Sequence, residues 1–466
     1  MYRKRHLTSF FVLAAVLIVG FAWGAAVVRY RVFPYSFISA AHRTVRVALP
    51  SGASQPRGRW RRHEADPRAS TPAGGTRANG DLSEEQRREI ERLEAIGYLS
   101  GTRPAPERSG VTVYDANRAW RGLNLVLSGH DASAYLMDMN GNILHEWRCR
   151  FRDVWPDNPI SDDAVGTHHW ACARLCANGD ILAAFQGLGL FKLDKDSNLL
   201  WSRARGYHHD IRVMPDGSIY TLEQKAHVIP SWDAERPMLE NFVSVLDCDG
   251  HPQRRVSMLD AFENSDYRAS VKRAGSQGDP FHANSIQRLD GSLSHLSPAF
   301  RQGNVLVSIR EMDAIAAIDL DAESVVWAMT GLFHRQHDAH LLATGNILLF
   351  DNQHAEGVSE ALEFDPITQE VKWSYAGSRE RPFYSEKCGV VQRLPNGNTL
   401  IVESDNGRAF EVTKEREIVW EYVNPHRAGE NGELIATLFQ VQRLPRRFPV
   451  DWAAGDAGRS SGADTE

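Results

Sequence analysis

Histidines recur at nearly the same point of a repeating pattern in this chain. His209 and His337 each lie eight residues before a turn glycine, His282 lies nine residues before one, and His169 opens the corresponding run of another repeat. A neutral imidazole is a nucleophile and a proton carrier near pH 7. Residues at matching repeat positions meet when the repeats surround an axis. We therefore expect these histidines to converge in one functional cluster.

The repeat that carries the histidines consists of four short β-type runs. The first run ends in a turn glycine, the second follows directly, the third has an acidic end and the fourth ends in a tryptophan. The tryptophans at this position are Trp147, Trp201, Trp327, Trp373 and Trp420. Four short strands that recur about every 40–50 residues are typical of the blades of a β-propeller.

The pattern predicts an all-β fold, a six-bladed β-propeller. The gap between Trp201 and Trp327 holds two units, of which the first lacks its tryptophan and the second carries an insertion. The first blade, near residues 123–147, lacks an innermost strand. Residues 437–445 are similar to residues 390–395 and are expected to supply that strand, so that the closed ring has no free sheet edges. The first strand of each blade then lines the channel, with the histidines at one end.

Four motifs resemble those of the bacterial aryl-sulfate sulfotransferase family, in the same order along the chain. They are His-His-Asp at 208–210, His-x-Asn-Ser-Ile at 282–286, Ser-Ile-Arg at 308–310 and Gln-His-Asp at 336–338, with Phe-Asp-Asn at 350–352 one strand later. The resemblance extends over about residues 122–444. It implies a six-bladed propeller that moves a sulfuryl group from a phenolic sulfate donor to a phenol acceptor. The resemblance also implies a ping-pong route through a sulfohistidine without a nucleotide sulfate donor, and no cofactor or metal is expected.

The residue types suit this chemistry. Sulfuryl transfer, like phosphoryl transfer, places charge on three equatorial oxygens, so it needs a nucleophile and fixed donors. The resemblance assigns the nucleophile to His337. Arg310 offers a planar fork of donors, His282 is a donor or the general acid for the phenolate, and His209 is a further donor. The candidates for substrate binding are Asn284, His208 and His169.

Other interpretations stay open. Arg310 can instead form a structural salt bridge, and Asn284 a hydrogen bond at a strand end. The chain can be a non-catalytic propeller that binds a partner, a histidine metal site, or a quinone-type propeller oxidoreductase. An arginine beside the histidines disfavours a divalent cation, and the sequence shows no acidic calcium-binding set of the quinone enzymes. The sequence also has Ser-Ile-Arg where the family has Ser-Ser-Arg, and it lacks the family's N-terminal β-sandwich.

Charge and cysteine content exclude some classes. The formal net charge of −6 disfavours a nucleic-acid partner, which usually requires a basic patch. Five cysteines without a CxxC pair form neither a disulfide scaffold nor a zinc ribbon. Cys172 and Cys176 form a disulfide in an oxidising compartment or stay buried thiols, and the sequence leaves both possibilities open. A homodimer is possible.

The N-terminal segment predicts membrane attachment. Basic residues at positions 3–5 precede an apolar run from 7 to 28, and about 20 apolar residues span a bilayer. Positive charge on the leading side keeps that side in the cytoplasm. We expect an uncleaved anchor at 1–30 with a periplasmic catalytic domain, and a cleaved signal peptide is the alternative. A flexible linker is expected at 31–80, a short amphipathic helix and connector at 81–110, the propeller at 111–449, and a disordered tail at 450–466.

Overall fold

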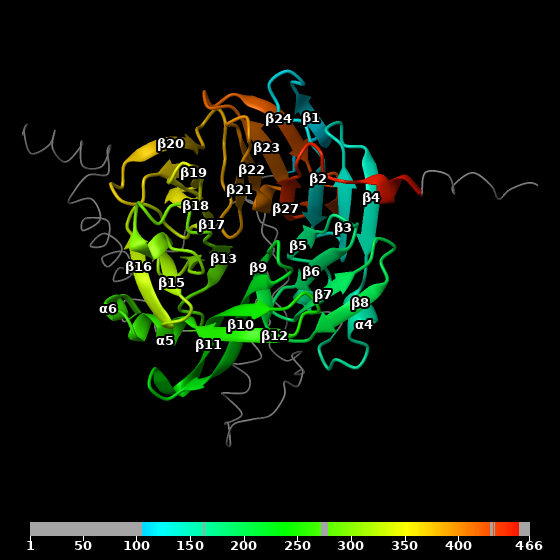
Figure 1. Cartoon of the computed structure of the whole chain (residues 1–466). Helices are drawn as coiled ribbons and strands as arrows, with labels where there is room; N and C mark the ends of the chain where they lie inside the picture. Colours follow the sequence, from blue (N-terminus) through cyan, green and yellow to red (C-terminus); the bar gives the residue numbers. More distant parts are fainter. Residues whose placement is uncertain (1–104, 162–163, 272–277, 429–431, 433, 456–466) are drawn as a thin grey trace, which may run out of the picture. The chain divides into compact units, whose positions relative to one another are not determined.

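Six antiparallel sheets of four or five strands are arranged in a ring in the computed structural model (Figure 1). The structure describes residues 105–161, 164–271, 278–428, 432 and 434–455. The predicted six-bladed propeller is confirmed. No helix within the described ranges is long and apolar enough to cross a membrane. The predicted anchor and linker, and all but the last residues of the predicted helix and connector, lie outside these ranges.

Blades 2 to 6 each run from an inner strand at the channel to an outer strand. Blade 2 consists of β5 (Cys172–Leu175), β6 (Ile181–Phe185), β7 (Gly189–Leu193) and β8 (Leu199–Arg203). Blade 3 consists of β9 (Tyr207–Val213), β10 (Ile219–Ile229), β11 (Asp233–Leu246) and β12 (Pro252–Ser257). Blade 4 consists of β13 (Ala283–Arg288), β14 (Val305–Ile309), β15 (Ala314–Asp319) and β16 (Ser324–Thr330). Blade 5 consists of β17 (His337–Leu341), β18 (Ile347–Ala355), β19 (Val358–Phe364) and β20 (Val371–Ala376). Blade 6 consists of β21 (Val390–Arg393), β22 (Thr399–Glu403), β23 (Arg408–Val412) and β24 (Ile418–Val423).

Blade 1 is built from both ends of the described chain. Its strand order is β27 (Leu438–Arg443), β2 (Asn124–Ser128), β3 (Ser133–Met137) and β4 (Ile143–Arg148). The inner strand β27 is the C-terminal segment, as predicted. An additional strand, β1 (Gly110–Tyr114), pairs with β24 at the outer edge of blade 6, so that blade has five strands. The sequence pattern did not predict this strand.

The remaining elements are short. The helices are α4 (Phe151–Val154), α5 (Met258–Glu263) and α6 (Arg268–Val271), of which the last two belong to the predicted insertion after blade 3. The short pair β25 (Arg427–Ala428) and β26 (Leu434–Ile435) precedes β27. Single 3-10 turns lie at η1 (Val165–Thr167), η2 (Pro298–Phe300), η3 (Ser404–Asn406) and η4 (Asp451–Gly455).

Three of the recurring tryptophans, Trp147, Trp373 and Trp420, hydrogen-bond to the next blade. The indole of Trp147 on blade 1 donates to the carbonyl of Gly179 in the first turn of blade 2, at 3.0 Å. Trp420 on blade 6 donates to Met139 on blade 1 at 2.9 Å. A buried indole N–H needs such a partner. The spacing of tryptophans therefore reflects contacts between blades.

Side chains form hydrogen bonds with backbone N–H groups at the inner edges of the blades. An innermost strand leaves backbone N–H groups unpaired on the channel side, which is costly when they are buried. Here a side chain of one inner strand accepts a hydrogen bond from the backbone of the next inner strand. The pairs are Asp210 with Ile286, Ser285 with Ala339, Asp338 with Val391, Gln392 with Arg443, and Gln440 with Ala173.

Candidate active site

Irregularities in three inner strands present the candidate residues to the channel. The pairing of β9, β13 and β17 with the second strand of each blade shifts register beside the histidines. His209, His282 and Asp338 have positive φ angles of 58°, 48° and 51°. Such a bulge turns a side chain away from the regular alternation of a strand and is frequent next to active sites. Regular strands would send successive side chains to opposite faces.

The structure brings His209, His282 and His337 together. One nitrogen of each imidazole lies within 4.8 Å of the others. The ring centroids of His209 and His282 are 5.1 Å apart, and those of His209 and His337 are 6.5 Å apart. These residues come from blades 3, 4 and 5, as the repeat positions predicted.

The hydrogen bonds of Asn352 determine the tautomer of His337. Asn352 lies on β18, and its Nδ2 donates to the carbonyl oxygens of Ser385 and Cys388, at 2.8 and 3.0 Å. Its Oδ1 therefore faces Nδ1 of His337, at 2.7 Å. The carbonyl oxygen of Arg335 lies 3.2 Å from the same nitrogen. Because both partners only accept, Nδ1 carries the proton and Nε2 carries the lone pair.

His337 is neutral and its Nε2 is available. Burial, followed by the charge of Arg310, lowers the pKa of His337 to about 3. Nε2 is buried and has no hydrogen-bond partner among the described residues. Burial also lowers the pKa of His209 well below its ordinary value, with a further contribution from the neighbouring His208. The imidazoles of His337 and His209 are therefore neutral through the physiological pH range.

Arg310 supplies positive charge next to the cluster. Its Nη1 pairs with Glu311, and Glu311 also pairs with Arg335. The salt bridge expected under the structural interpretation is therefore present. However, Nε of Arg310 is buried and has no partner among the described residues. A guanidinium that retains a buried, unpaired donor is suited to bind an anion.

Asn284 holds the residue that precedes the nucleophile candidate. Its Nδ2 donates to the backbone oxygen of Gln336 at 2.8 Å, while its Oδ1 is buried without a partner in the described chain. Gln336 in turn donates to Ser308 and to two backbone oxygens. Asn284 therefore lines the site and also holds the backbone immediately before β17 in place.

The other two predicted binding residues lie behind the cluster. Nδ1 of His208 is 2.6 Å from Nδ1 of His209. His169 stacks on Phe439, with ring centroids 4.5 Å apart and an interplanar angle of 6°. Burial lowers the pKa of His208 to about 3 and that of His169 to about 4. Neither side chain lines the cavity described next.

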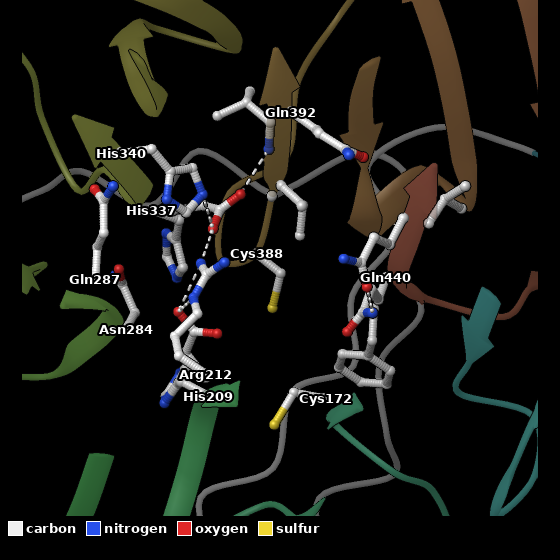
Figure 2. A pocket seen from close by; sticks show the side chains of 18 of the residues that line it. Cys172, His209, Arg212, Asn284, Gln287, His337, His340, Cys388, Gln392 and Gln440 are labelled. Atoms are coloured by element: carbon white, nitrogen blue, oxygen red, sulfur yellow. Dashed lines mark hydrogen bonds and ion pairs between the residues drawn. The ribbon is translucent and has the colours of Figure 1, made fainter. Parts of the chain in front are cut away.

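A cavity of about 420 Å³ extends from the histidines into the channel. His209, His337 and Asn284 line it, and the ring of Phe439 supplies an aromatic wall. Cys172 and Cys388 also line it (Figure 2). All cysteines of the described chain are free thiols, so Cys172 is not paired with Cys176 in the structure.

Asp338 follows His337 in the sequence but has other partners. Its carboxylate lies 2.8 Å from Nε2 of His340 and accepts the backbone N–H of Val391 at 2.8 Å. The partner that orients His337 is Asn352. The motif at 350–352 signalled that residue without revealing its role, whereas nothing in the sequence assigned roles to Phe439 or to Asp279, the partner of His282.

The three-histidine cluster has the spacing of a possible metal site. Imidazole nitrogens bind zinc and copper. A second group with suitable spacing consists of Asp351, His354 and Glu360 on blade 5. At the histidine cluster, the charge of Arg310 opposes a divalent cation.

Comparisons with known proteins place this geometry in a family. A search of the curated proteins found no match. Among solved structures, a Bacteroides caccae protein of unknown function is 12% identical, with a TM-score of 0.44 over 65% of this chain and 94% of that one. A streptogramin B lyase structure is also 12% identical, with a TM-score of 0.40 over 73% of this chain and 93% of that one. These scores are too low to support an argument about function. The family model described as Arylsulfotransferase (ASST) matches residues 173–425, more than half of the sequence, and this match includes all the motifs noted above. The chain belongs to the arylsulfotransferase family.

Proposed function

We propose that this chain transfers a sulfuryl group from a phenolic sulfate ester to a phenol, through a sulfohistidine on Nε2 of His337. The observation that carries the proposal is the fixed tautomer of His337. It places an unpaired lone pair in a buried site beside a guanidinium. Membership of the arylsulfotransferase family supports the same reaction class.

The first half-reaction uses groups that are already in position. The lone pair on Nε2 of His337 attacks sulfur and forms an N–S bond, while the S–O bond to the phenol breaks and its electron pair stays on oxygen. Nδ1 keeps its proton and its hydrogen bond to Asn352. Arg310 stabilises the charge on the sulfuryl oxygens, and Phe439 packs against the aryl ring. In the second half-reaction the acceptor oxygen forms an S–O bond and its hydroxyl proton passes to a base, while the N–S bond breaks and leaves its electron pair on Nε2.

The proposal is tested with the full chain and a chromogenic aryl sulfate in the absence of an acceptor. We expect a burst of about one phenol per chain and the added mass of one sulfuryl group on His337. His337→Ala should lose the burst and the label. His295→Ala, at an exposed turn, is the matched control and should keep both. A burst that survives in His337→Ala, or a label on His282 or His209, would contradict the assignment.

A metal centre is the second candidate, because three imidazole nitrogens lie within 4.8 Å of one another. The metal content of the purified chain separates the two candidates. Stoichiometric zinc together with no burst from any phenolic sulfate would favour the metal centre. A sulfuryl-labelled His337 in metal-free protein would exclude a metal centre as the basis of the transfer.

We also propose that residues 1–30 anchor the enzyme, with the propeller in the periplasm. The support is the basic segment followed by an apolar run of about 20 residues. The protein should stay with membranes after an alkaline wash and keep its N-terminal residues. Intact mass corresponding to a chain that begins near Ala25 would contradict this. A homodimer stays a prediction.

A further inference from the structure

Two imidazoles of the cluster have partners of different chemistry. Nδ1 of His337 faces the neutral amide of Asn352 at 2.7 Å. Nδ1 of His282 faces the carboxylate of Asp279 at 2.7 Å. A carboxylate next to an imidazole strongly stabilises its protonated form, whereas a neutral amide oxygen does so only weakly. Similar groups in contrasting environments take different proton-transfer roles.

Asp279 is held firmly in this contact. Its Oδ1 accepts the backbone N–H of His282 at 2.9 Å and lies 3.3 Å from Nδ2 of Asn241. Asn241 is a buried residue of β11, and its Oδ1 accepts the backbone N–H of Ala283 at 3.0 Å. Blade 3 thus fixes both the carboxylate and the strand that follows His282.

The charge state of Asp279 agrees with this arrangement. Its side chain is 13% exposed, and that of His282 is 11% exposed. Burial alone raises the pKa of the Asp279 carboxyl, yet the pKa lies below its ordinary value because His282 and the hydrogen bonds stabilise the carboxylate. A buried carboxylate of this kind needs a cationic partner. The imidazole of His282 is the partner of the Asp279 carboxylate in this contact.

We infer that Asp279 is a positioning residue that makes His282 the proton carrier of the transfer reaction. Because Nδ1 of His282 is engaged with the carboxylate, the transferred proton uses Nε2. The inference rests on the proposed function and adds an acid–base pair to it. Asp279 acts through His282 and does not contact substrate.

The proton balance follows the two half-reactions. As the S–O bond of the donor breaks, Nε2 of His282 gives its proton to the phenolate oxygen, and His282 becomes neutral. When the acceptor phenol attacks the sulfohistidine, its hydroxyl proton returns to Nε2 of His282. Asp279 stays ionised throughout, and no external acid or oxidant is needed.

The test compares two donors in the first half-reaction. Phenolate is a poor leaving group, since a phenol has a pKa of about 10, whereas 4-nitrophenolate leaves readily without a proton. In Asp279→Asn we expect the burst rate with phenyl sulfate to fall by about 10²-fold, the scale of general acid catalysis. With 4-nitrophenyl sulfate the rate should fall much less. Asp279→Glu keeps a carboxylate and should restore part of the difference.

Two further variants complete the test. Asp319→Asn is the matched control, because Asp319 is a mostly buried aspartate on blade 4 that pairs with Arg301 away from the histidines, and it should leave the ratio of the two rates unchanged. Asn241→Ala removes a hydrogen bond that positions Asp279 and leaves both members of the acid–base pair in place. This variant provides the test if Asp279→Asn does not fold. It should shift the ratio in the same direction by a smaller factor.

The outcomes separate the inference from the proposed function. If wild-type enzyme turns over both donors and the Asp279 variant slows both equally, Asp279 is only structural and the inference is wrong. An unchanged ratio in folded Asn241→Ala, when Asp279→Asn is unfolded, has the same meaning. If the wild-type chain turns over neither donor, the proposed function itself fails.

Discussion

Arg443 on β27 and Glu411 on β23 form an ion pair at 2.9 Å in which neither side chain is exposed to solvent. Arg443 also donates to Oδ1 of Asn124 at 2.6 Å, and Glu411 accepts from Nδ2 of Asn398 at 2.7 Å. The pair therefore links blade 1, at its closing strand, to blade 6. Removing one partner of a buried pair leaves an uncompensated charge.

Arg443→Met should lower the free energy of unfolding by about 3–5 kcal/mol, because Glu411 then stays buried without its cation. The double variant Arg443→Met, Glu411→Gln should recover part of the loss. Urea unfolding measures both effects. An unchanged midpoint in the single variant would contradict a role for the pair in stability.

Deletion of residues from Ala436 onward should prevent stable folding, because blade 1 then lacks β27 and exposes the edge of β2. The melting temperature and the oligomeric state of the truncated chain are the measurements. A matched deletion that begins at residue 456, after η4, should have little effect. Equal melting of the shorter and the full chain would argue against ring closure by β27.

Asn352→Leu should lower the burst rate by about 10²-fold, the scale for the loss of one preorganised group. His337 would lose the acceptor that holds the proton on Nδ1. Asn352→Asp should behave differently, since a carboxylate favours protonated His337, and its activity should fall toward acidic pH. Burst rates across pH test both variants. Wild-type rates in Asn352→Leu would show that the tautomer is set elsewhere.

Arg310→Ala should still bind the aryl sulfate but react about 10²–10³-fold more slowly, because one stabilising donor is lost. The fold should be near normal, since Arg310 pairs with its neighbour Glu311 and not with a distant blade. Glu311→Gln is the informative companion, because it removes the salt bridge and leaves the guanidinium. A large stability loss with an unchanged burst in Arg310→Ala would favour a purely structural role.

Stability should fall as pH drops below about 6.5. Burial lowers the pKa of His169 to about 4 and those of His208 and His337 to about 3. Below about 6.5 the unfolded chain takes up protons that the folded chain does not, so each histidine costs about 1.4 kcal/mol per pH unit. Asp405 opposes this, because burial raises its pKa to about 7. The histidines outnumber it, so the net slope retains this sign.

His169→Gln measures this effect outside the cluster. The variant should reduce the slope of unfolding free energy against pH between about 6.5 and 4 by one proton's contribution. His295→Gln, at an exposed turn, is the control and should leave the slope unchanged. The same slope in both variants would show that the pKa of His169 does not differ between the folded and the unfolded chain as its burial implies.

The blades were predictable because their signals are local: turn glycines, β-type runs and the tryptophans that reach the next blade. β1 was not predictable, since it pairs with β24, about 300 residues later, and lies outside the four-strand repeat. Asp338 was misleading for a similar reason. It adjoins His337 in sequence, but the bulge in β17 directs it to His340 and to blade 6.

The candidate site was predictable where repeats place residues, and unpredictable where loops do. His209, His282 and His337 follow from repeat positions. Asp279 lies in the connection after the insertion, with no periodic signal, and only the fold brings Asn241 against it. The role of Asn352 could not be predicted, because it depends on two backbone carbonyl groups that orient its amide and that only the fold brings near it.

Closure of the first blade by the last strand also has a kinetic consequence. β2 pairs with β27 across more than 300 residues, so this pairing has a very large loop-closure entropy and a high contact order. A ribosome must release the chain through Arg443 before β27 is available. The ring cannot close during synthesis, and incomplete chains expose an unpaired strand to proteases and to other copies. Chains whose synthesis stops before β27 cannot complete blade 1, so the fold itself makes such truncated products susceptible to degradation and aggregation.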